Sequence, residues 1–239
     1  MRSIQVESQF HMENWASFSI IRELANQVRN SKSSNEFPLI LPGNCNTCVG
    51  TIAGVGTEKT GIIWLDAHGD FNTPETTLSG FLDGMGLSML TGKCWKRMIE
   101  QVDGFKPIDE AYILLAGARD FGEDEEKSLR NSQIRLAHYD QIRMKRVEET
   151  ILPLLTSIRK SVDRIYFHID LDVLDPTVAP ANHFFVPGGL DPDEVLSIIR
   201  AVRERFHIVA AAIAAYAPSY DEKGATIQAA FRFAKELVT

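Results

Sequence analysis

Two short segments combine carboxylates with an imidazole at a spacing that suits metal chemistry. Asp66, His68 and Asp70 alternate along one segment, and Asp170 and Asp172 alternate along another. Side chains two residues apart in an extended segment lie on the same face, so each segment can direct its polar groups to one point. Carboxylates at this density repel one another unless a cation neutralises them. The two segments therefore predict a metal cluster.

Carboxylate oxygens dominate the predicted ligand set, and they favour hard or borderline divalent ions such as Mn²⁺ over a thiolate zinc site. Asp66, Asp70 and Asp175 could each instead be an ordinary turn or cap residue. That alternative does not account for candidate ligands that cluster in two separate segments. We therefore expect divalent ions here.

Each polar segment directly follows an apolar run, and such runs recur along the chain. Runs without polar alternation are typical of strands covered on both faces, as in a parallel sheet. Helical stretches between them predict an α/β fold, whose ligands bind beyond the carboxyl ends of the strands. The expected strands are residues 38–41, 61–65, 111–116, 164–169 and 207–211, and the expected helices are residues 15–30, 85–102, 123–131, 142–162, 192–206 and 225–237.

Local signals refine two of these helices. Asp191 can cap the helix that starts at Pro192, and acidic residues follow in its first turn. Pro153 lies inside residues 142–162, and we expect it to kink or split that helix. The chain shows no fixed-period repeat and no long linker, which favours one domain.

Composition narrows the class of protein. The chain has 239 residues, 44% hydrophobic and 24% charged, which suits a large core and excludes a disordered chain. A net charge of −7 without a basic block predicts a small-molecule substrate and no nucleic-acid partner. Three cysteines cannot all pair, and no signal peptide or bilayer-length apolar run is evident. We expect a cytoplasmic protein with no membrane partner.

Longer motifs surround the two polar segments. Asp-Ala-His-Gly-Asp at 66–70 precedes Asn-Thr-Pro-Glu-Thr-Thr and Ser-Gly, and Asp-Leu-Asp-Val-Leu-Asp-Pro occupies 170–176. They resemble the two strongest signatures of the ureohydrolase family, which comprises arginase, agmatinase and formiminoglutamase. The resemblance covers residues 37–221. It implies a three-layer α/β/α sandwich with a mainly parallel sheet, formed by a single domain over residues 1–239 with a shortened N-terminal region.

The resemblance also implies a chemistry. Two Mn²⁺ ions would activate a metal-bridging hydroxide that cleaves a C–N bond of an amidine or guanidine. Asp70 could also orient that hydroxide. Family members commonly form homo-oligomers, either trimers or hexamers. By position, the resemblance implies that Asp66 and Asp170 bridge the two ions. His68 and Asp172 would complete the ligand set of one ion, and Asp70 would bind the other.

The first family signature is altered here. It normally reads Gly-Gly-Asp-His-Ser, whereas residues 42–46 read Pro-Gly-Asn-Cys-Asn, so Cys45 replaces a ligand histidine. A thiolate can bind a divalent ion but is softer, so Zn²⁺, Fe²⁺ and Co²⁺ become alternatives to Mn²⁺. Alternatively, Cys45 is only a small buried residue.

Substrate-contacting positions are only partly retained. Asp83 replaces a proton-transferring histidine, and an aspartate can take that role. Ala215 replaces a glutamate that pairs with the substrate's guanidinium, which makes arginine a doubtful substrate.

The positions that contact the amino-acid end of the substrate are also mixed. Asn72 and Ser79 match the family's substrate-binding residues, whereas Phe81 replaces an asparagine. Gly122 or Asp124 stands where the family has an aspartate that binds the amino group.

These features predict a metal-dependent hydrolase acting on a linear amidine or guanidine other than arginine. One alternative is a catalytically degenerate binding or regulatory protein of the same fold. Another is a thiol redox protein that uses the Cys-x-x-Cys pair, Cys45 and Cys48. His168 and His183 flank the second segment, and we expect both to be packed or supporting imidazoles.

Overall fold

The computed structural model describes residues 13–239, in which six strands form one parallel sheet. The strands are β1 (Leu39–Ile40), β2 (Thr60–Leu65), β3 (Ile113–Ala116), β4 (Arg135–Ala137), β5 (Arg164–Asp170) and β6 (His207–Ala214). Their order across the sheet is β1-β6-β5-β2-β3-β4, and every neighbouring pair is parallel. The central strands β2 and β5 are neighbours and pair as far as Leu65 and Ile169, so they end side by side.

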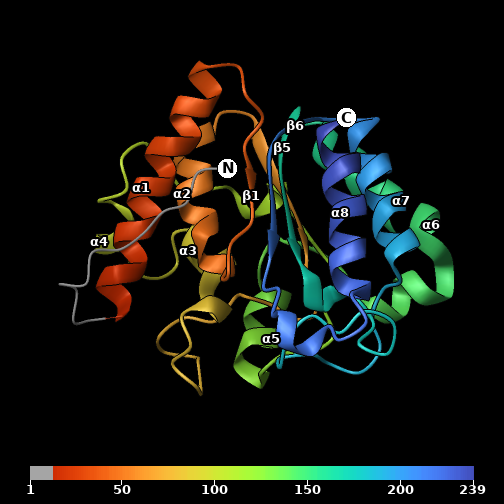
Figure 1. Ribbon diagram of the computed structural model, residues 1–239. Helices are drawn as coiled ribbons and strands as arrows, with labels where there is room; N and C mark the ends of the chain where they lie inside the picture. The colour runs from red at the N-terminus through yellow and green to blue at the C-terminus, as the bar shows by residue number, and fades with distance from the viewer. Residues whose placement is uncertain (1–12) are drawn as a thin grey trace.

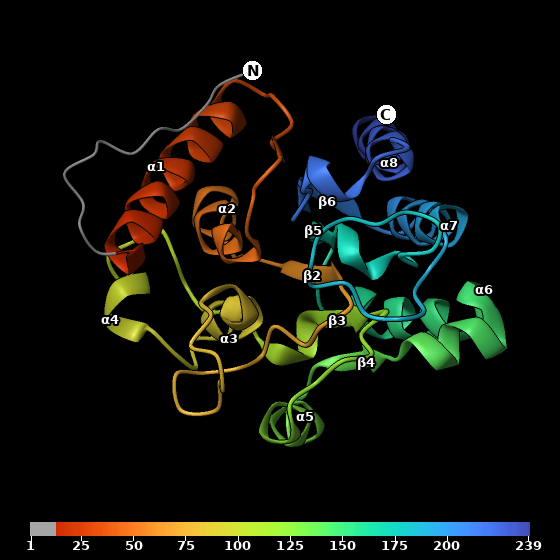
Figure 2. The same cartoon turned by 60° about the horizontal axis from the view of Figure 1, so that its bottom comes forward.

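Helices cover both faces of this sheet, as Figure 1 and Figure 2 show. The predicted three-layer α/β/α sandwich is thus confirmed. No helix within residues 13–239 combines the length and apolar character needed to cross a bilayer. One layer contains α1 (Glu13–Ser33), α2 (Cys48–Val55), α3 (Gly86–Leu90) and α4 (Lys96–Ile99), the other contains α6 (Tyr139–Arg159), α7 (Pro192–Arg203) and α8 (Ala225–Val238), and α5 (Glu123–Arg130) lies near the carboxyl ends of the strands.

The central strands are buried on both faces, which explains their continuous apolar sequence. All six residues of β2 are buried. Ile63 and Leu65 belong to the core beneath α6, α7 and α8, whereas Ile62 and Trp64 belong to the core beneath α1, α2 and α3. Full burial of one large apolar side chain contributes about 1.5–3 kcal/mol. The sheet is therefore a stable base for the polar residues that follow it.

Several predicted elements differ from the observed ones. The sequence did not predict β4, which has three residues, or α2, which is buried along its whole length, because neither shows an alternation of apolar and polar residues. The helix expected over residues 85–102 is divided into α3 and α4. Left-handed backbone at Gly92 (φ 73°) and Trp95 (φ 50°) separates the two helices.

The break in α6 was predicted at the wrong residue. Arg146 has a left-handed φ of 65°, which interrupts the helix, while Pro153 lies within the helix. The Thr150 hydroxyl spans the break and donates a hydrogen bond to the Gln141 carbonyl (3.2 Å). A hydrogen bond from a side chain to the backbone thus spans the interruption at Arg146.

The predicted N-terminus of α7 is confirmed. Asp191 accepts hydrogen bonds from the backbone N–H groups of Asp193 and Glu194, each at 2.9 Å. Glu194 completes a capping box by accepting a hydrogen bond from the Asp191 backbone (2.9 Å).

Asp191→Ala should therefore lower the free energy of unfolding by about 1 kcal/mol, because two N–H groups lose their acceptor. Asp191→Asn, which retains a capping oxygen, is the control and should be close to wild type. Urea denaturation measures the free energy of unfolding of both variants. Equal losses in the two variants would show that the cap is not the cause.

Candidate metal centre and cavity

Two neighbouring strands deliver the predicted ligands to one edge of the sheet. Leu65 of β2 pairs with Ile169 of β5, so Asp66 and Asp170 leave the sheet at the same level. Their two segments also bring Asp70 and Asp172 to this edge, and all four aspartates are buried. The expected convergence of the two segments is therefore observed.

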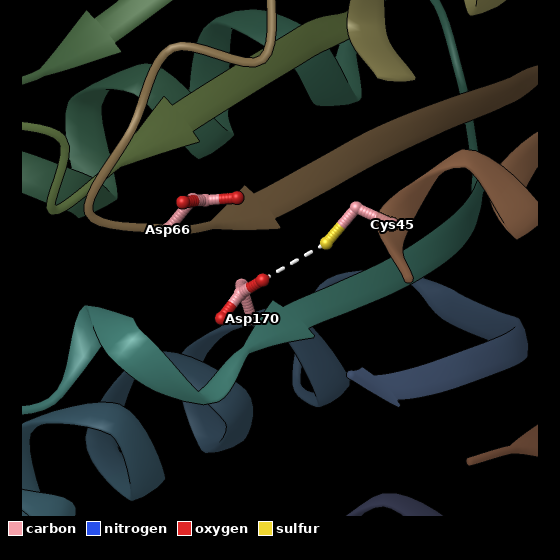
Figure 3. Close-up of side chains that lie close together, drawn as sticks. All are labelled: Cys45, Asp66 and Asp170. Atoms are coloured by element: carbon pink, nitrogen blue, oxygen red, sulfur yellow. Dashed lines mark hydrogen bonds between the residues drawn. The ribbon is translucent and has the colours of Figure 1, made fainter. Parts of the chain in front are cut away.

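Two groups of potential ligand atoms occur within residues 13–239, and in each group all the atoms lie within 4.8 Å of one another. The first group consists of Cys45, Asp66 and Asp170. Figure 3 shows Cys45, on the short 3-10 helical turn before α2, directed toward Asp170 at the end of β5, with Asp66 beside them at the end of β2. The second group consists of Asp66, His68 and Asp172. Asp66 belongs to both groups, so two neighbouring ions could share its carboxylate, whereas Asp170, the other carboxylate expected to bridge, belongs to the first group.

Hydrogen bonds fix the orientation of these carboxylates. The Trp64 indole donates to Asp66 Oδ2 (3.0 Å), and the His68 backbone N–H donates to Asp66 Oδ1 (2.8 Å). Asp172 Oδ1 accepts from the Ala67 backbone (3.2 Å). The His68 ring faces both carboxylates, with Nδ1 3.3 Å from Asp66 Oδ1 and 3.4 Å from Asp172 Oδ2. The second group is thus preorganised by the backbone of its own segment.

The local charge balance favours cation binding. Burial raises the pKa of Asp66 and of Asp170, and the negative charge of Asp172 raises both further. Burial opposes protonation of His68, yet hydrogen bonds and charges from Asp172 and Asp66 raise its pKa to about 12. A single imidazolium cannot balance four buried carboxylates. The oxygen-rich donor set and its excess negative charge therefore fit divalent cations.

Cys45 contacts both a carboxylate and a histidine. Its thiol donates to Asp170 Oδ2 (3.0 Å), and its sulfur lies 3.1 Å from His168 Nε2. His168 Nδ1 is 2.8 Å from the Tyr166 hydroxyl, and the ring stacks on Trp64 at 3.7 Å. Burial lowers the pKa of His168 to about 3, so the ring is neutral. An imidazole that accepts from Tyr166 at Nδ1 carries its proton on Nε2, where it donates to the sulfur.

His168 therefore has the supporting position that the sequence predicted. Burial, followed by the charges of Asp170 and neighbouring aspartates, raises the pKa of the Cys45 thiol well above its ordinary value. A bound divalent cation has the opposite effect, because it stabilises the thiolate. The geometry thus places the sulfur where it can act as a ligand.

Asp70 lies beside these groups but belongs to neither. It is buried and lines the adjacent cavity, and its backbone is left-handed (φ 48°). Its carbonyl accepts a hydrogen bond from the Leu87 N–H at the start of α3 (2.9 Å). Strained backbone of this kind persists where the surroundings hold it, commonly at functional sites. Burial and the charges of Asp66 and Asp83 raise the pKa of Asp70.

Arg119 ties the loops beneath the site together. Its guanidinium donates to the carbonyls of Asp172 (3.0 Å) and Val186 (3.1 Å), and to Gly117 and Pro187 at 3.2 and 3.3 Å. Tyr139 lies against the guanidinium at 5.7 Å. Arg119 therefore holds the backbone around the ligands through hydrogen bonds, while its charge also interacts with the carboxylates of Asp172 and Asp66.

A cavity of about 520 Å³ opens directly above the ligands. Cys45, His68, Asp70, Asp170 and Asp172 form part of its lining. This volume accommodates a small organic molecule. A substrate in the cavity would therefore meet the candidate metal centre.

The other predicted site residues have different positions. Asp83 lines the cavity and accepts hydrogen bonds from Asn46 N–H (3.0 Å) and Asn44 Nδ2 (3.1 Å). Asn72 also lines the cavity. Ser79 instead lies in an adjoining groove, where it accepts a hydrogen bond from the Phe81 N–H (3.2 Å).

Ala215 and either Gly122 or Asp124 stand at two positions where the resemblance leads us to expect an acidic residue, and none of the three offers the cavity a carboxylate. Ala215 lines the cavity with a left-handed φ of 61°, held by hydrogen bonds to Pro42 O (3.2 Å) and from Asn182 Nδ2 (3.0 Å). Gly122 also lines the cavity, whereas Asp124 is exposed outside it.

Sequence reasoning missed Glu125 and misplaced His183. Glu125 is buried, lines the cavity and accepts from the Phe71 N–H (2.9 Å). Its i,i+4 spacing to buried Leu129 was the available signal, hidden within four consecutive acidic residues. His183 is exposed at the cavity, where it contacts Phe184 instead of being packed inside.

The match to known proteins covers the fold and the site. The arginase family matches residues 3–239. The arginase of Bacillus caldovelox is 35% identical over 215 residues, which cover 87% of this chain and 70% of that protein. The arginase of Staphylococcus aureus (strain MRSA252) is 33% identical over 177 residues, which cover 72% of this chain and 57% of that protein.

Solved structures give the same result. An arginase from Bacillus cereus superposes with a TM-score of 0.89 at 28% identity, covering 95% of this chain and 79% of that chain. The formimidoylglutamase from Bacillus subtilis superposes with a TM-score of 0.80 at 23% identity, covering 98% of this chain and 69% of that chain, and so shares the fold.

If Cys45 is a ligand, Co²⁺-loaded protein should show a sulfur-to-cobalt charge-transfer band, because a thiolate bonds the ion directly. Cys45→Ser should abolish the band. Cys48→Ser is the matched control, since Cys48 is equally buried but its thiol faces the Gly86 carbonyl (3.7 Å). Ultraviolet absorption measures the band, and its persistence in Cys45→Ser would rule out this sulfur.

Proposed function

Because this chain belongs to the arginase family, we propose that it is a metal-dependent hydrolase that cleaves a C–N bond of an amidine or guanidine other than arginine. The observation that carries the proposal is the pair of ligand groups that share Asp66 and open into a cavity. Ala215 at the cavity wall offers no carboxylate to a guanidinium, so arginine and every other guanidine would bind without that contact. The restriction on substrate rests instead on the cavity lining, which within residues 13–239 holds no lysine or arginine side chain to pair with the carboxylate of an arginine substrate.

The residues divide naturally between two ions. Asp66, His68 and Asp172 would hold one, and Cys45, Asp66 and Asp170 would hold the other, with Asp70 beside them. Mn²⁺ is the expected ion, and Cys45 makes Zn²⁺, Fe²⁺ or Co²⁺ the alternatives. When bound, such ions supply Lewis acidity and activate water for attack on a trigonal carbon.

Asp70 would orient the attacking water. Its carboxylate is buried at the cavity next to the ligand groups, and the contact to α3 fixes its backbone. A carboxylate in this position can accept a hydrogen bond from the water and so direct a lone pair of the water oxygen toward the substrate carbon.

Asp83 would accept a proton from the attacking water and pass it to the leaving amine. Burial raises its pKa to about 6, although the hydrogen bonds from Asn46 and Asn44 lower it. This pKa is close to the ordinary value for histidine, the family residue that Asp83 replaces, so the carboxyl can exchange protons near neutral pH. Each Asp83 oxygen accepts one of the two hydrogen bonds and retains a lone pair for a proton.

The two alternatives make different demands on the site. A binding or regulatory role would explain why Cys45, Asp83 and Ala215 differ from the residues that the family resemblance leads us to expect. A thiol redox protein needs accessible thiolates, whereas Cys45 and Cys48 are buried and burial raises the pKa of both. The hydrolase explains why the remaining ligands converge beside a cavity.

Asp170→Asn tests the proposal, because it removes a carboxylate ligand while keeping the shape. We expect loss of bound metal and a fall in turnover of more than about 100-fold. Asp175→Asn, in the same segment, is the control, because its carboxylate only accepts hydrogen bonds from Thr177.

Metal analysis and assays for urea, ammonia or formamide across a panel of amidines give the readouts. A folded wild-type protein without metal or turnover would overturn the hydrolase and leave the binding or regulatory alternative.

Asp83→Asn should lower kcat by about 100-fold with little change in KM, since it removes a proton acceptor but not the ligands. Asp83→His should restore part of the rate. In the wild type, activity should fall as the pH drops through the pKa of Asp83, because protonation removes the acceptor. Steady-state pH profiles check this, and an unchanged acid limb in Asp83→Asn would assign that limb to another group.

A further inference from the structure

The mouth of the cavity carries a pair of aromatic side chains. Phe81 and Phe184 stack with their ring centroids 5.2 Å apart at an interplanar angle of 27°. Both line the cavity, yet they remain 41% and 43% exposed. Phe81 belongs to the loop after β2 and Phe184 to the loop after β5, so two different loops meet at this contact.

This contact differs from ordinary surface exposure. A single exposed phenylalanine, such as Phe231 of α8, is common on soluble proteins and indicates nothing by itself. Phe81 and Phe184 instead form a contiguous apolar surface over a polar site, and His183 extends it by lying 3.8 Å from the Phe184 ring. Exposed apolar surface beside a cavity is typical of a ligand-contact site.

The charges in the cavity select against an acidic ligand. Its lining within residues 13–239 contains acidic side chains and histidines but no lysine or arginine. Asp120 and Glu125 lie on the same lining, toward α5. A carboxylate on the outer part of a substrate would therefore find no cationic partner and would meet negative charge.

We infer that the substrate is a guanidine or amidine with an apolar outer arm that lacks a carboxylate, and that Phe81 and Phe184 select this arm. The inference rests on the proposed function for the reacting end of the substrate. An apolar arm in the cavity would cover ring surface that water otherwise contacts, which favours binding. The amino-acid end of arginine gains none of this contact.

Benzylamine, the amine that cleavage of benzylguanidine would release, is a binding probe that cannot itself be hydrolysed. Isothermal titration calorimetry of Mn²⁺-loaded protein should give a Kd for benzylamine about tenfold below that for ornithine, the amino-acid counterpart. Methylamine, which has no arm, should bind more weakly than benzylamine. Equal affinity for ornithine and benzylamine would overturn the inference.

Alanine variants test whether Phe81 and Phe184 make the contact with benzylamine. Phe81→Ala and Phe184→Ala should each weaken benzylamine binding by about 3- to 10-fold and leave methylamine binding unchanged. Phe185→Ala is the matched control, because Phe185 is 50% exposed but does not line the cavity. Benzylamine binding that is unchanged in both cavity variants, or weakened equally by Phe185→Ala, would overturn the role of the pair.

Turnover separates this inference from the proposed function. Hydrolysis of benzylguanidine with a lower KM than arginine supports both. Hydrolysis across the amidine panel without preference for benzylguanidine retains the hydrolase and overturns the aromatic selection. If benzylamine binds as expected in the wild type and the variants but no compound is hydrolysed, the aromatic binding site is supported and the proposed hydrolase activity is overturned.

Discussion

Mutual repulsion among buried carboxylates is the constraint on which this site depends. Asp66, Asp70, Asp170 and Asp172 lie at the ends of two central strands, with His68 as the one imidazole among the candidate ligands. Burying charge without compensation costs several kcal/mol per group. The protein offsets part of this with hydrogen bonds from Trp64 and from backbone N–H groups. The remainder is the electrostatic driving force for binding cations.

The fold makes that concentration of charge possible. β2 and β5 pair in register as far as Leu65 and Ile169 and are buried on both faces, so the strand ends cannot move apart without disrupting the core. Arg119 adds a second restraint, because its guanidinium joins the carbonyls of loops that lie far apart in sequence. The rigid strands and restrained loops together hold the candidate metal ligands close to one another, although repulsion between their charges would otherwise drive them apart.

Sequence reasoning predicted the parts of the molecule that local chemistry determines. Five strands, the cap at Asp191 and the meeting of Asp66 with Asp170 follow from apolar runs, capping rules and the common edge of a parallel sheet. Glu125 and the exposed position of His183 depend on how distant loops fold over the sheet, which spacing does not encode. Likewise, the break at Arg146 depends on a backbone conformation that residue type alone did not indicate.

The altered residues show that the deep and outer parts of the site obey different constraints. At the bottom, Cys45 lies where the resemblance leads us to expect a histidine, and its sulfur contacts both Asp170 and a neutral His168. At the mouth, the Phe81 and Phe184 rings offer apolar contact area and no hydrogen-bonding group, and the cavity lining within residues 13–239 has no basic side chain. Donor geometry can therefore be preserved while the outer wall changes. A shared reaction with a different substrate is the outcome that this separation permits.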